Sequence, residues 1–249
     1  MLIGNKVIIL PSCHSTNQFL KEKMKNDCVS GEVVCAKIQS SGRGQRGNVW
    51  ESEPKQNLTF SFYLEPFQLD IKHQFSLNYF VSLAIYDFLE EFLPNKSLLQ
   101  LKWPNDIYYN NKKIGGVLIE NQVKDLFVAN TIVGIGLNIN QLKFNLPRAT
   151  SLAIETNEKY EIEEALGFLL RSLNKRYLSF SLDDVHNLKS DYLTKLMGFK
   201  KIRSYQDNLT GDFFLGEIIG VKDTGELVIS NGIGRVLEYG LKEITFLFE

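Results

Sequence analysis

The chain contains few of the residues that build metal centres or disulfide frameworks. Three cysteines and three histidines occur among its 249 residues. Cys13, Cys28 and Cys35 are odd in number, are not spaced as metal ligands, and follow no signal-like apolar segment. The histidines show no zinc-binding spacing, and the sequence has neither a Ser-His-Asp nor a Cys-His signature, so we assign them no catalytic role. We therefore expect reduced cysteines and a cytoplasmic protein.

Long apolar runs and a large net charge are also missing from the sequence. A transmembrane helix needs about 20 consecutive apolar residues. The longest apolar run here, FVANTIVGIGLNI at 127–139, is interrupted by asparagines. The net charge of −1 at pH 7 gives no general attraction to nucleic acids or to anionic membranes. We therefore expect a soluble globular protein that binds neither membranes nor nucleic acids.

The hydrophobic residues that are present make up 44% of the chain, which suffices for a sizeable core. Residues 6–11 are typical of a buried strand, and Ser15 with Gln18 fits a capping box at the start of a helix. The segments 31–40 and 57–65 indicate two further strands. The pattern therefore predicts a strand, a helix and two more strands, in that order.

The middle of the chain alternates between helical and β-rich patterns. Apolar residues on one helical face predict a long helix at 73–93 that covers one face of a sheet. Short β-rich runs separated by turn signals predict a β-meander at 98–140. Two further amphipathic helices are predicted at 157–180 and 182–198. These patterns predict an α+β fold in which helices cover a β-sheet.

The C-terminal segment has a different residue pattern. From Phe199 onward, short strands and turns predict a small barrel that is too short to be an independent enzyme. We therefore predict two domains, at 1–196 and 197–249.

A loop rich in glycine and arginine, which we call the Gly-Arg loop (residues 40–50), connects the second and third predicted strands. Glycine lets a ligand approach the backbone closely, and arginine offers planar donors that suit phosphate or carboxylate. This composition predicts an anion-binding loop, although a solvated surface loop can have the same composition. A Walker A loop would end in Gly-Lys-Ser/Thr, which is absent, so an ordinary P-loop site is not expected.

Two other segments carry polar residues in short clusters. One is Ser-Thr-Asn at 15–17, and the other is KWPND at 102–106, followed by KKIGGVLIEN at 112–121. Together with the Gly-Arg loop, and in this order, these segments resemble the biotin protein ligases. The resemblance implies a mixed β-sheet covered by helices, which is the class II aminoacyl-tRNA synthetase-like biotin/lipoate ligase fold, with a small C-terminal SH3-like barrel. It also suggests the form without an N-terminal DNA-binding domain, because the first motif begins at Ser15.

The resemblance implies a biotin site in the first half of the chain. Ser15, Thr16, Asn17 and Gln39 would line the pocket for the ureido ring, although the first three residues also fit a plain helix cap. Within the Gly-Arg loop, the residues expected to close over the biotin carboxylate and the nucleotide phosphates are Gly42, Arg43, Gly44 and Arg46, with Trp50 packing as the loop becomes ordered. Gln45 stands where several relatives carry arginine.

The resemblance places the nucleotide along the later segments. Lys113 matches the family's catalytic lysine, with a solvated hairpin lysine as the alternative, and Arg43 is the second candidate catalytic residue. Gly115 and Gly116 would let their strand approach biotin closely. The residues implied for ATP contacts are Arg43, Lys102, Asn105, Asp106, Lys113 and Asn138, of which Asn105 and Asp106 are also candidate Mg²⁺ ligands. We interpret Trp103 and Pro104 as structural residues.

These expectations combine into a two-step ligase that consumes ATP with Mg²⁺ and takes biotin as its substrate. The acceptor would be a lysine on the biotin carboxyl carrier domain of a biotin-dependent carboxylase or decarboxylase. Lipoate protein ligase is the alternative enzyme, and a non-catalytic ligand-binding protein is the alternative class. A homodimer is one candidate assembly, because the sequence leaves the oligomeric state open.

Overall fold

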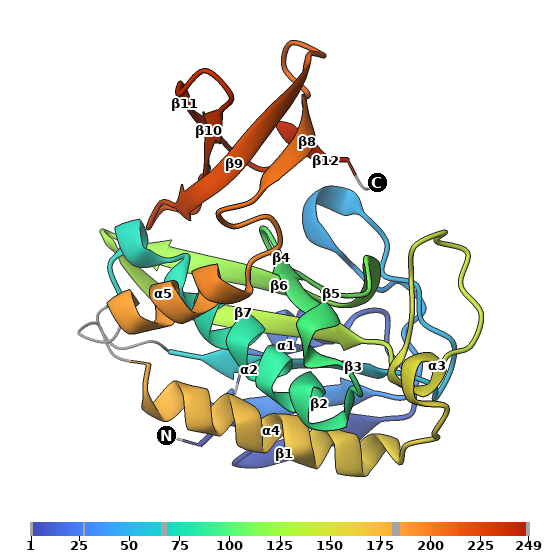
Figure 1. Cartoon of the computed structure of the whole chain (residues 1–249). Helices are drawn as coiled ribbons and strands as arrows, with labels where there is room; N and C mark the ends of the chain where they lie inside the picture. Colours follow the sequence, from blue (N-terminus) through green and yellow to red (C-terminus); the bar gives the residue numbers. More distant parts are fainter. Residues whose placement is uncertain (1, 27, 66–68, 181–184, 248–249) are drawn as a thin grey trace.

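The computed structural model describes residues 2–26, 28–65, 69–180 and 185–247, except for the side chain of Arg46. A seven-stranded mixed sheet forms the larger part of the molecule, and a five-stranded antiparallel sheet forms the C-terminal part (Figure 1). The strands of the larger sheet are β1 (Lys6–Leu10), β2 (Glu32–Ala36), β3 (Leu58–Leu64), β4 (Leu99–Lys102), β5 (Asp106–Tyr109), β6 (Lys112–Lys124) and β7 (Phe127–Leu137). Their order is β1-β2-β3-β7-β6-β5-β4, with β1 and β2 parallel and the other pairs antiparallel. This arrangement confirms the predicted mixed sheet.

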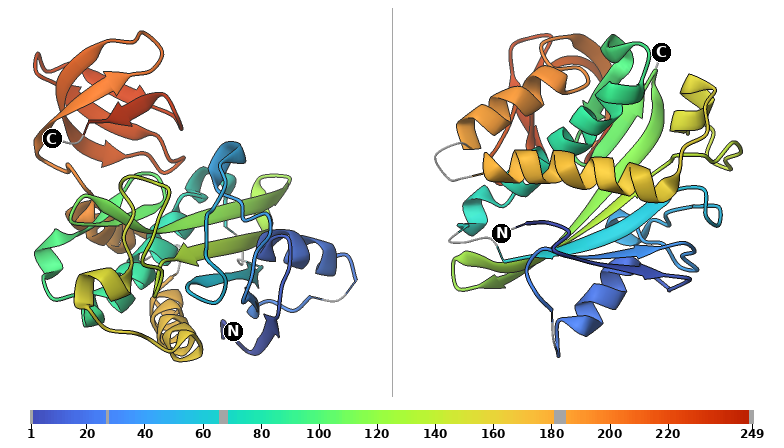
Figure 2. Two further views of the ribbon diagram at one scale, coloured as in Figure 1. Left: turned by 90° about the vertical axis from the view of Figure 1, so that its right-hand side faces the viewer. Right: turned by 90° about the horizontal axis from the view of Figure 1, so that it is seen from below.

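The main hydrophobic core lies between one face of this sheet and a layer of helices. The helices of the larger part are α1 (Thr16–Lys23), α2 (Ser76–Phe92), α3 (Leu152–Thr156), α4 (Ile162–Leu178) and α5 (Val185–Lys195), with short 3₁₀ turns at Gln45–Gly47, Ile71–His73 and Lys96–Leu98. Phe60 and Phe62 of β3 pack in one cluster with Phe80 of α2 and Leu169 of α4, and all four side chains are fully buried. Figure 2 shows α4 lying across the strands when the molecule is seen from below.

Helix α1 packs on the opposite face of the sheet, against β3 and β7. Its Leu20 is fully buried with Val34 and Ile132 in a smaller cluster. Every residue of β3 is buried, because its two faces serve the main core and the α1 side in alternation. Such a strand carries small polar side chains under α1, and Ser61 is one of them.

The predicted burial of the first strand is wrong. Strand β1 pairs on one side only, with β2, and forms an edge of the sheet. Val7 is 40% exposed and Ile9 is 41% exposed. An apolar pattern gives no information on whether a strand is central or at an edge, so the sequence could not distinguish these positions.

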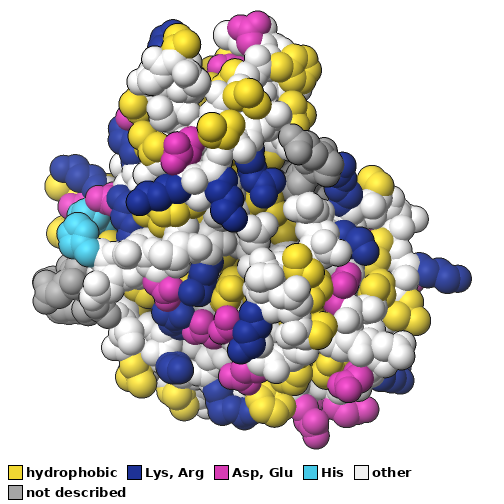
Figure 3. All heavy atoms as spheres, in the orientation of Figure 1, with side chains coloured by type: hydrophobic (Ala, Val, Ile, Leu, Met, Phe, Trp, Pro, Cys, Tyr) yellow, Lys and Arg dark blue, Asp and Glu magenta, His cyan; other side chains and the backbone are white. Residues whose placement is uncertain are grey.

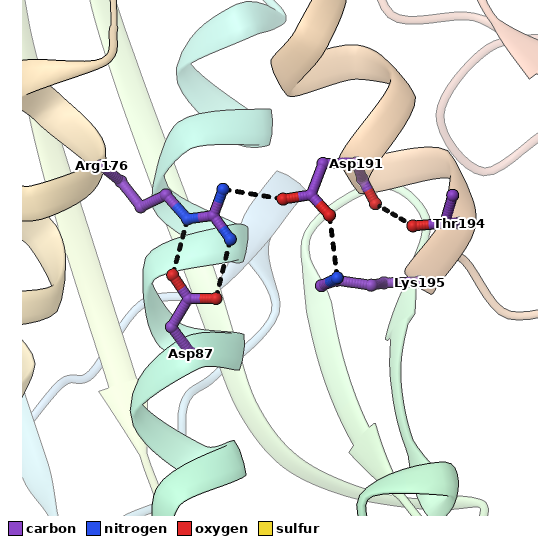
Figure 4. A network of polar contacts seen from close by, with 5 residues as sticks. All are labelled: Asp87, Arg176, Asp191, Thr194 and Lys195. Atoms are coloured by element: carbon purple, nitrogen blue, oxygen red, sulfur yellow. Dashed lines mark hydrogen bonds and ion pairs between the residues drawn. The ribbon is translucent and has the colours of Figure 1, made fainter.

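An ionic network holds the three long helices of the core layer together (Figure 4). Arg176 of α4 donates Nε and Nη2 to the two carboxylate oxygens of Asp87 on α2, at 2.6 and 2.8 Å. The same guanidinium donates Nη1 to Asp191 of α5 at 2.7 Å, and Lys195 donates to the other oxygen of Asp191 at 2.8 Å. These hydrogen bonds raise the pKa of Arg176 and lower that of Asp191, although burial opposes both shifts. The fork geometry of arginine therefore fixes the spacing of α2, α4 and α5.

The C-terminal sheet contacts the larger part through a turn and a strand edge. Its strands are β8 (Ile202–Asp207), β9 (Phe213–Val221), β10 (Leu227–Asn231), β11 (Val236–Tyr239) and β12 (Ile244–Phe246), in the order β11-β10-β9-β8-β12. Trp103 donates its Nε1–H to the carbonyl of Gly225 at 2.9 Å. A Cβ on Gly225, which has φ +113°, would lie 2.7 Å from the ring of Phe75, so this turn requires glycine. Before β8, the N–H of Met197 donates to the carbonyl of Leu101, a residue of the edge strand β4, at 2.7 Å.

Charged side chains of both signs are spread over the surface in view in Figure 3, and Lys and Arg gather where the C-terminal sheet meets the larger part. Among the described residues, every helix is too short or too polar to cross a membrane. The five-stranded antiparallel sheet agrees with the expected small SH3-like domain. The domain boundary at 196/197 remains a prediction.

Candidate active site

A cavity of about 280 Å³ lies on the α1 face of the larger sheet, where the Gly-Arg loop and the C-terminal sheet approach it. Its floor is largely backbone, because β6 and β7 contribute Gly116, Gly134 and Gly136 to it. Most of the residues predicted from the sequence line this cavity: Ser15, Thr16, Asn17, Gln39, Arg43, Gly44, Trp50, Lys102, Asn105, Asp106, Lys113 and Gly116. Segments that are far apart in the chain therefore meet around one space of a size that suits a small ligand.

The cavity wall next to α1 carries the neutral polar side chains of Ser15, Thr16, Asn17 and Gln39. The backbone N–H of Thr16 donates to Oε1 of Gln39 at 2.8 Å. Oγ of Ser61 lies 2.6 Å from Oγ1 of Thr16 and 2.5 Å from Oδ1 of Asn17. Nδ2 of Asn17 donates to Oε2 of Glu120 at 2.8 Å. We call these five side chains the polar network; it joins α1 to strands β3 and β6 and to the segment after β2.

The predicted capping box at the start of α1 is wrong. Ser15 occupies the N-cap position with extended backbone, but its side chain makes no capping hydrogen bond. The side chain of Gln18 donates to Glu22 one turn further along, at 2.8 Å. The N–H of Thr16 is satisfied instead by Gln39, from a distant segment. A tertiary contact has therefore replaced the local cap.

The Gly-Arg loop forms a short hairpin at the rim of the cavity. The N–H of Gly44 donates to the carbonyl of Asn48 at 2.7 Å, and that of Trp50 donates to the carbonyl of Gly42 at 3.0 Å. A Cβ on Gly42 would lie 2.5 Å from the Trp50 carbonyl oxygen, so glycine is needed for this close pairing. Arg43 is exposed at the rim.

Trp50 lies over the floor of the cavity. A Cβ on Gly136 would lie 2.3 Å from its indole ring, so the ring and the β7 backbone are in direct contact. Nζ of Lys113 lies 5.7 Å from the centre of the same ring. Trp50 therefore lies against the floor of the cavity and close to its charged end.

The opposite end of the cavity is charged. Nζ of Lys113 lies 2.5 Å from Oδ1 of Asp106. Nζ of Lys102 lies 4.8 Å from the ring centre of Phe246, and burial lowers the pKa of Lys102 against the opposing effect of Asp106. Lys242 also lines this end. Because Asp106 is the one carboxylate among the described lining residues, the lysines leave an excess of positive charge that suits a phosphate.

The two candidate Mg²⁺ ligands are adjacent, but both already make protein contacts. Nδ2 of Asn105 donates to the carbonyl of Val117, and Asp106 pairs with Lys113. The described part of the chain contains no group of three or more His, Cys, Asp or Glu side chains that could hold a metal. Mg²⁺ typically takes one or two carboxylates and completes its coordination with substrate phosphates and water. The donors present therefore fit a metal that arrives with a nucleotide.

Four of the predicted site residues are not found on the cavity wall. Gly42 packs inside the hairpin, and Gly115 faces the core side of the sheet. Asn138 is buried and donates Nδ2 to the carbonyl of Thr150 at 2.9 Å. The side chain of Arg46 lies outside the described residues. The positions of Gly42, Gly115 and Asn138 therefore give no support to their predicted roles, and the role of Arg46 stays a prediction.

Sequence reasoning missed residues of three kinds. Gly134 and Gly136 alternate in the VGIG stretch of β7, and glycines in a strand are a signal of close backbone approach. Ser61 and Glu120 lie on predicted strands and gave no signal. The C-terminal sheet and its turns contribute Leu241, Lys242, Ile244 and Phe246. Their position depends on long-range packing, which local patterns do not encode.

The comparisons with known proteins agree with this geometry. Residues 9–138 match the model of the Biotin/lipoate A/B protein ligase family. The bifunctional ligase/repressor BirA of Bacillus subtilis is 28% identical over 238 residues, which cover 94% of this chain and 72% of that protein. Biotin–protein ligase 1 of Arabidopsis thaliana, a chloroplastic protein, is 35% identical over 141 residues, which cover 55% of this chain and 37% of that protein.

A solved structure shows the same fold over its whole length. The biotin protein ligase of Aquifex aeolicus, in complex with biotin and ATP, superimposes with a TM-score of 0.79 and 27% identity. The match covers 98% of this chain and all of that chain. These findings confirm the resemblance inferred from the sequence motifs, and the chain belongs to the biotin/lipoate A/B protein ligase family.

Proposed function

We propose that the protein attaches biotin to a lysine of a biotin carboxyl carrier domain, through a biotinyl-5′-AMP intermediate. The observation that carries this proposal is the division of one cavity into a neutral polar end and a positively charged end. Biotin has the same division, because its ureido ring is neutral and its valerate carboxylate is anionic. The ring would bind next to α1, and the carboxylate would point toward the lysines.

The first step joins biotin to AMP. A carboxylate oxygen of biotin attacks the α-phosphorus of ATP, and the bond from that phosphorus to the pyrophosphate oxygen breaks. Lys113 lies among the cavity's charged residues, where a developing negative charge would be stabilised. Lys102 and Lys242 would hold the phosphates, and Arg43 would close the rim over the reacting groups. The protein then acts mainly by positioning two anions and neutralising their charge.

Mg²⁺ would bind beside Asp106 and Asn105, together with the phosphates. When bound, it supplies further neutralisation of the phosphate charge. Asp106 and Asn105 would hold the metal, and Lys113, whose Nζ lies 2.5 Å from Oδ1 of Asp106, would supply positive charge beside it.

The second step transfers biotin to the acceptor protein. The unprotonated amine of a carrier-domain lysine attacks the acyl carbon of the adenylate, AMP leaves, and an amide bond forms. The Gly-Arg hairpin and Trp50 cover the cavity from the rim. Excluding water there would protect the mixed anhydride from hydrolysis.

Lipoate protein ligase is the runner-up, since the matched family includes both activities. The dithiolane ring of lipoate has no N–H group and no carbonyl. It would offer no partner to Nε2 of Gln39, whose Oε1 already accepts from the Thr16 N–H, and an amide covered without a partner is costly. This observation favours biotin.

The test is to incubate the protein with ATP, Mg²⁺ and either biotin or lipoate, and to identify the acyl adenylate by mass spectrometry. We expect biotinyl-5′-AMP with biotin, and a biotinylated lysine after a purified carrier domain is added. A lipoyl adenylate alone would assign the protein to the lipoate activity. Absence of both adenylates would refute a catalytic role.

A further inference from the structure

The turn between β9 and β10, residues 222–226, is closed by its own hydrogen bonds and also contacts the larger part. The N–H of Lys222 donates to the carbonyl of Glu226 at 2.8 Å, and the N–H of Gly225 donates to the carbonyl of Lys222 at 2.9 Å. The carbonyl of Gly225 accepts from Trp103, which lines the cavity, at 2.9 Å. Because the turn is closed, a shift of one of its residues also moves Gly225.

Asp223 of this turn lies opposite positive and titratable groups of the larger part. Nζ of Lys189 lies 2.7 Å from Oδ1 of Asp223. Nδ1 of His73 lies 3.8 Å from Oδ2 of Asp223, and this nitrogen is buried without a hydrogen-bond partner among the described residues. The hydrogen bond from Lys189 is the largest cause that lowers the pKa of Asp223, and burial opposes it. His73 and His186 lower this pKa further.

The groups that interact electrostatically with Asp223 come from three elements of the larger part. Lys189 and His186 belong to α5, His73 belongs to the short turn before α2, and Tyr79 belongs to α2. Burial raises the pKa of Tyr79 most, and the charge of Asp223 raises it further. Histidine ordinarily gains its positive charge between pH 8 and pH 5. The positive charge that faces Asp223 therefore increases as the pH falls through this range.

We propose that Asp223 is a positioning residue for the charged end of the active site, and that protonation of His73 and His186 strengthens its hold. Asp223 fixes the Gly225 carbonyl through the closed turn, and this carbonyl fixes Trp103 of the KWPND segment. Asp223 acts through these contacts, because it does not itself line the cavity. The inference rests on the proposed function, in which the charged end of the cavity binds ATP.

A kinetic experiment measures the effect on the ATP site. The side chains of Lys189 and Asp223 are 27% and 43% exposed. Partly exposed ion pairs of this kind change equilibrium constants by about 2-fold to 5-fold. Asp223→Asn should therefore raise the KM for ATP by about 2-fold to 5-fold at pH 8. The kcat and the KM for biotin should stay close to the wild-type values, because the polar network is distant from this turn.

A spectroscopic experiment measures the position of Trp103 without any substrate. The chain has two tryptophans, so Trp103→Phe identifies the indole N–H signal of Trp103 in a ¹⁵N NMR spectrum. In the wild-type protein, the chemical shift of this signal should change between pH 8 and pH 5.5, as the histidines gain charge and attract the turn. The change should be absent in Asp223→Asn and smaller in His73→Gln.

Glu238→Gln is the matched control, because Nζ of Lys222 lies 3.0 Å from Oε2 of Glu238 in an exposed ion pair within the C-terminal sheet. It should alter neither the KM for ATP nor the pH dependence of the Trp103 signal. A wild-type KM for ATP in Asp223→Asn, or a wild-type pH dependence of the signal in that variant, would overturn the inference. If the wild-type protein forms no adenylate, the proposed function fails, whereas the Trp103 signal still decides whether Asp223 positions that residue.

Discussion

The two ends of the cavity differ in their hydrogen bonding and in their charge. At the α1 end, Thr16, Asn17 and Ser61 are neutral and already hydrogen-bonded to one another. At the other end, Lys113 and Lys102 are charged, and one carboxylate accompanies them among the described lining residues. The first end has a fixed pattern of donors and acceptors, whereas the second has a surplus of charge.

This difference predicts that one end of the cavity determines the affinity for biotin and the other end determines the rate of adenylate formation. A fixed hydrogen-bond pattern binds the substrate and the transition state equally, so changes there should alter the KM or Kd for biotin. A surplus of positive charge interacts most strongly where negative charge develops, so changes there should alter the rate of adenylate formation. The following predictions, from the largest effect to the smallest, test this division.

Lys113→Ala should slow adenylate formation by about 10²-fold to 10³-fold, because it removes a preorganised positive charge next to the reacting phosphate. Biotin affinity should change little, since the polar network is intact. Pyrophosphate release measures the rate of adenylate formation, and calorimetric titration measures the affinity for biotin. Lys112→Ala is the matched control, because Lys112 is exposed and its Nζ lies 3.8 Å from Oε1 of Glu155. A normal rate in Lys113→Ala, or a defect in Lys112→Ala instead, would contradict the assignment.

Thr16→Val should weaken biotin binding by about 10-fold to 100-fold, because an almost isosteric methyl group replaces a buried hydroxyl. The rate of pyrophosphate release at saturating biotin should remain close to that of the wild type. Thr59→Val controls for the loss of a buried hydroxyl, since Thr59 donates to the carbonyl of Ala36 at 2.8 Å on the same strand as Ser61. Equal losses of affinity in both variants would show that the loss comes from disturbed folding and not from a lost contact with biotin.

Trp103→Phe should raise the KM for ATP by about 3-fold to 10-fold, because it removes the hydrogen bond to Gly225 that ties the KWPND segment to the C-terminal sheet. Asn105 and Asp106 belong to the same segment, just after Pro104, and should lose some of their fixed position. Steady-state kinetics with each substrate varied in turn would measure the effect. An equal rise in the KM for biotin would show that the whole cavity, and not one end of it, depends on this contact.

The smallest effect should appear at alkaline pH. Burial lowers the pKa of Lys102 below its ordinary value of 10.5, so its charge is lost at a lower pH than for an exposed lysine. As the pH rises in the range below 10.5, the KM for ATP should therefore increase a few-fold, while the KM for biotin stays flat. Lys102→Met should have a raised KM for ATP that no longer depends on pH in this range. The same pH dependence in both proteins would exclude Lys102 as its source.

Much of this arrangement could be predicted from short motifs, because each motif supplies its own local geometry. The Ser-Thr-Asn turn, the Gly-Arg loop and KWPND all reach one cavity, as their resemblance implied. The pairing register could not be predicted, and it decides which of two adjacent residues faces the ligand. Gly116 lines the cavity while Gly115 faces the core, although the sequence treats them alike.

Contacts between distant segments could also not be predicted from the sequence. Ser61 belongs to an alternating strand pattern that predicts its face but not its partner. Phe246 reaches Lys102 only because the C-terminal sheet folds back over β4 and β5. In each case a residue with an ordinary local pattern takes part in the site through tertiary packing.

The junction between α5 and the C-terminal sheet has a consequence for shortened forms of the protein. Strand β4 is an edge of the larger sheet, and Leu196 and Met197 pair with Leu101 along it. The predicted boundary at 196/197 passes through this pairing. A protein cut there would present an unprotected strand edge to other molecules, and such edges promote aggregation. A shortened form that keeps Met197 and Gly198 should remain monodisperse at higher concentrations than one that ends at Lys195.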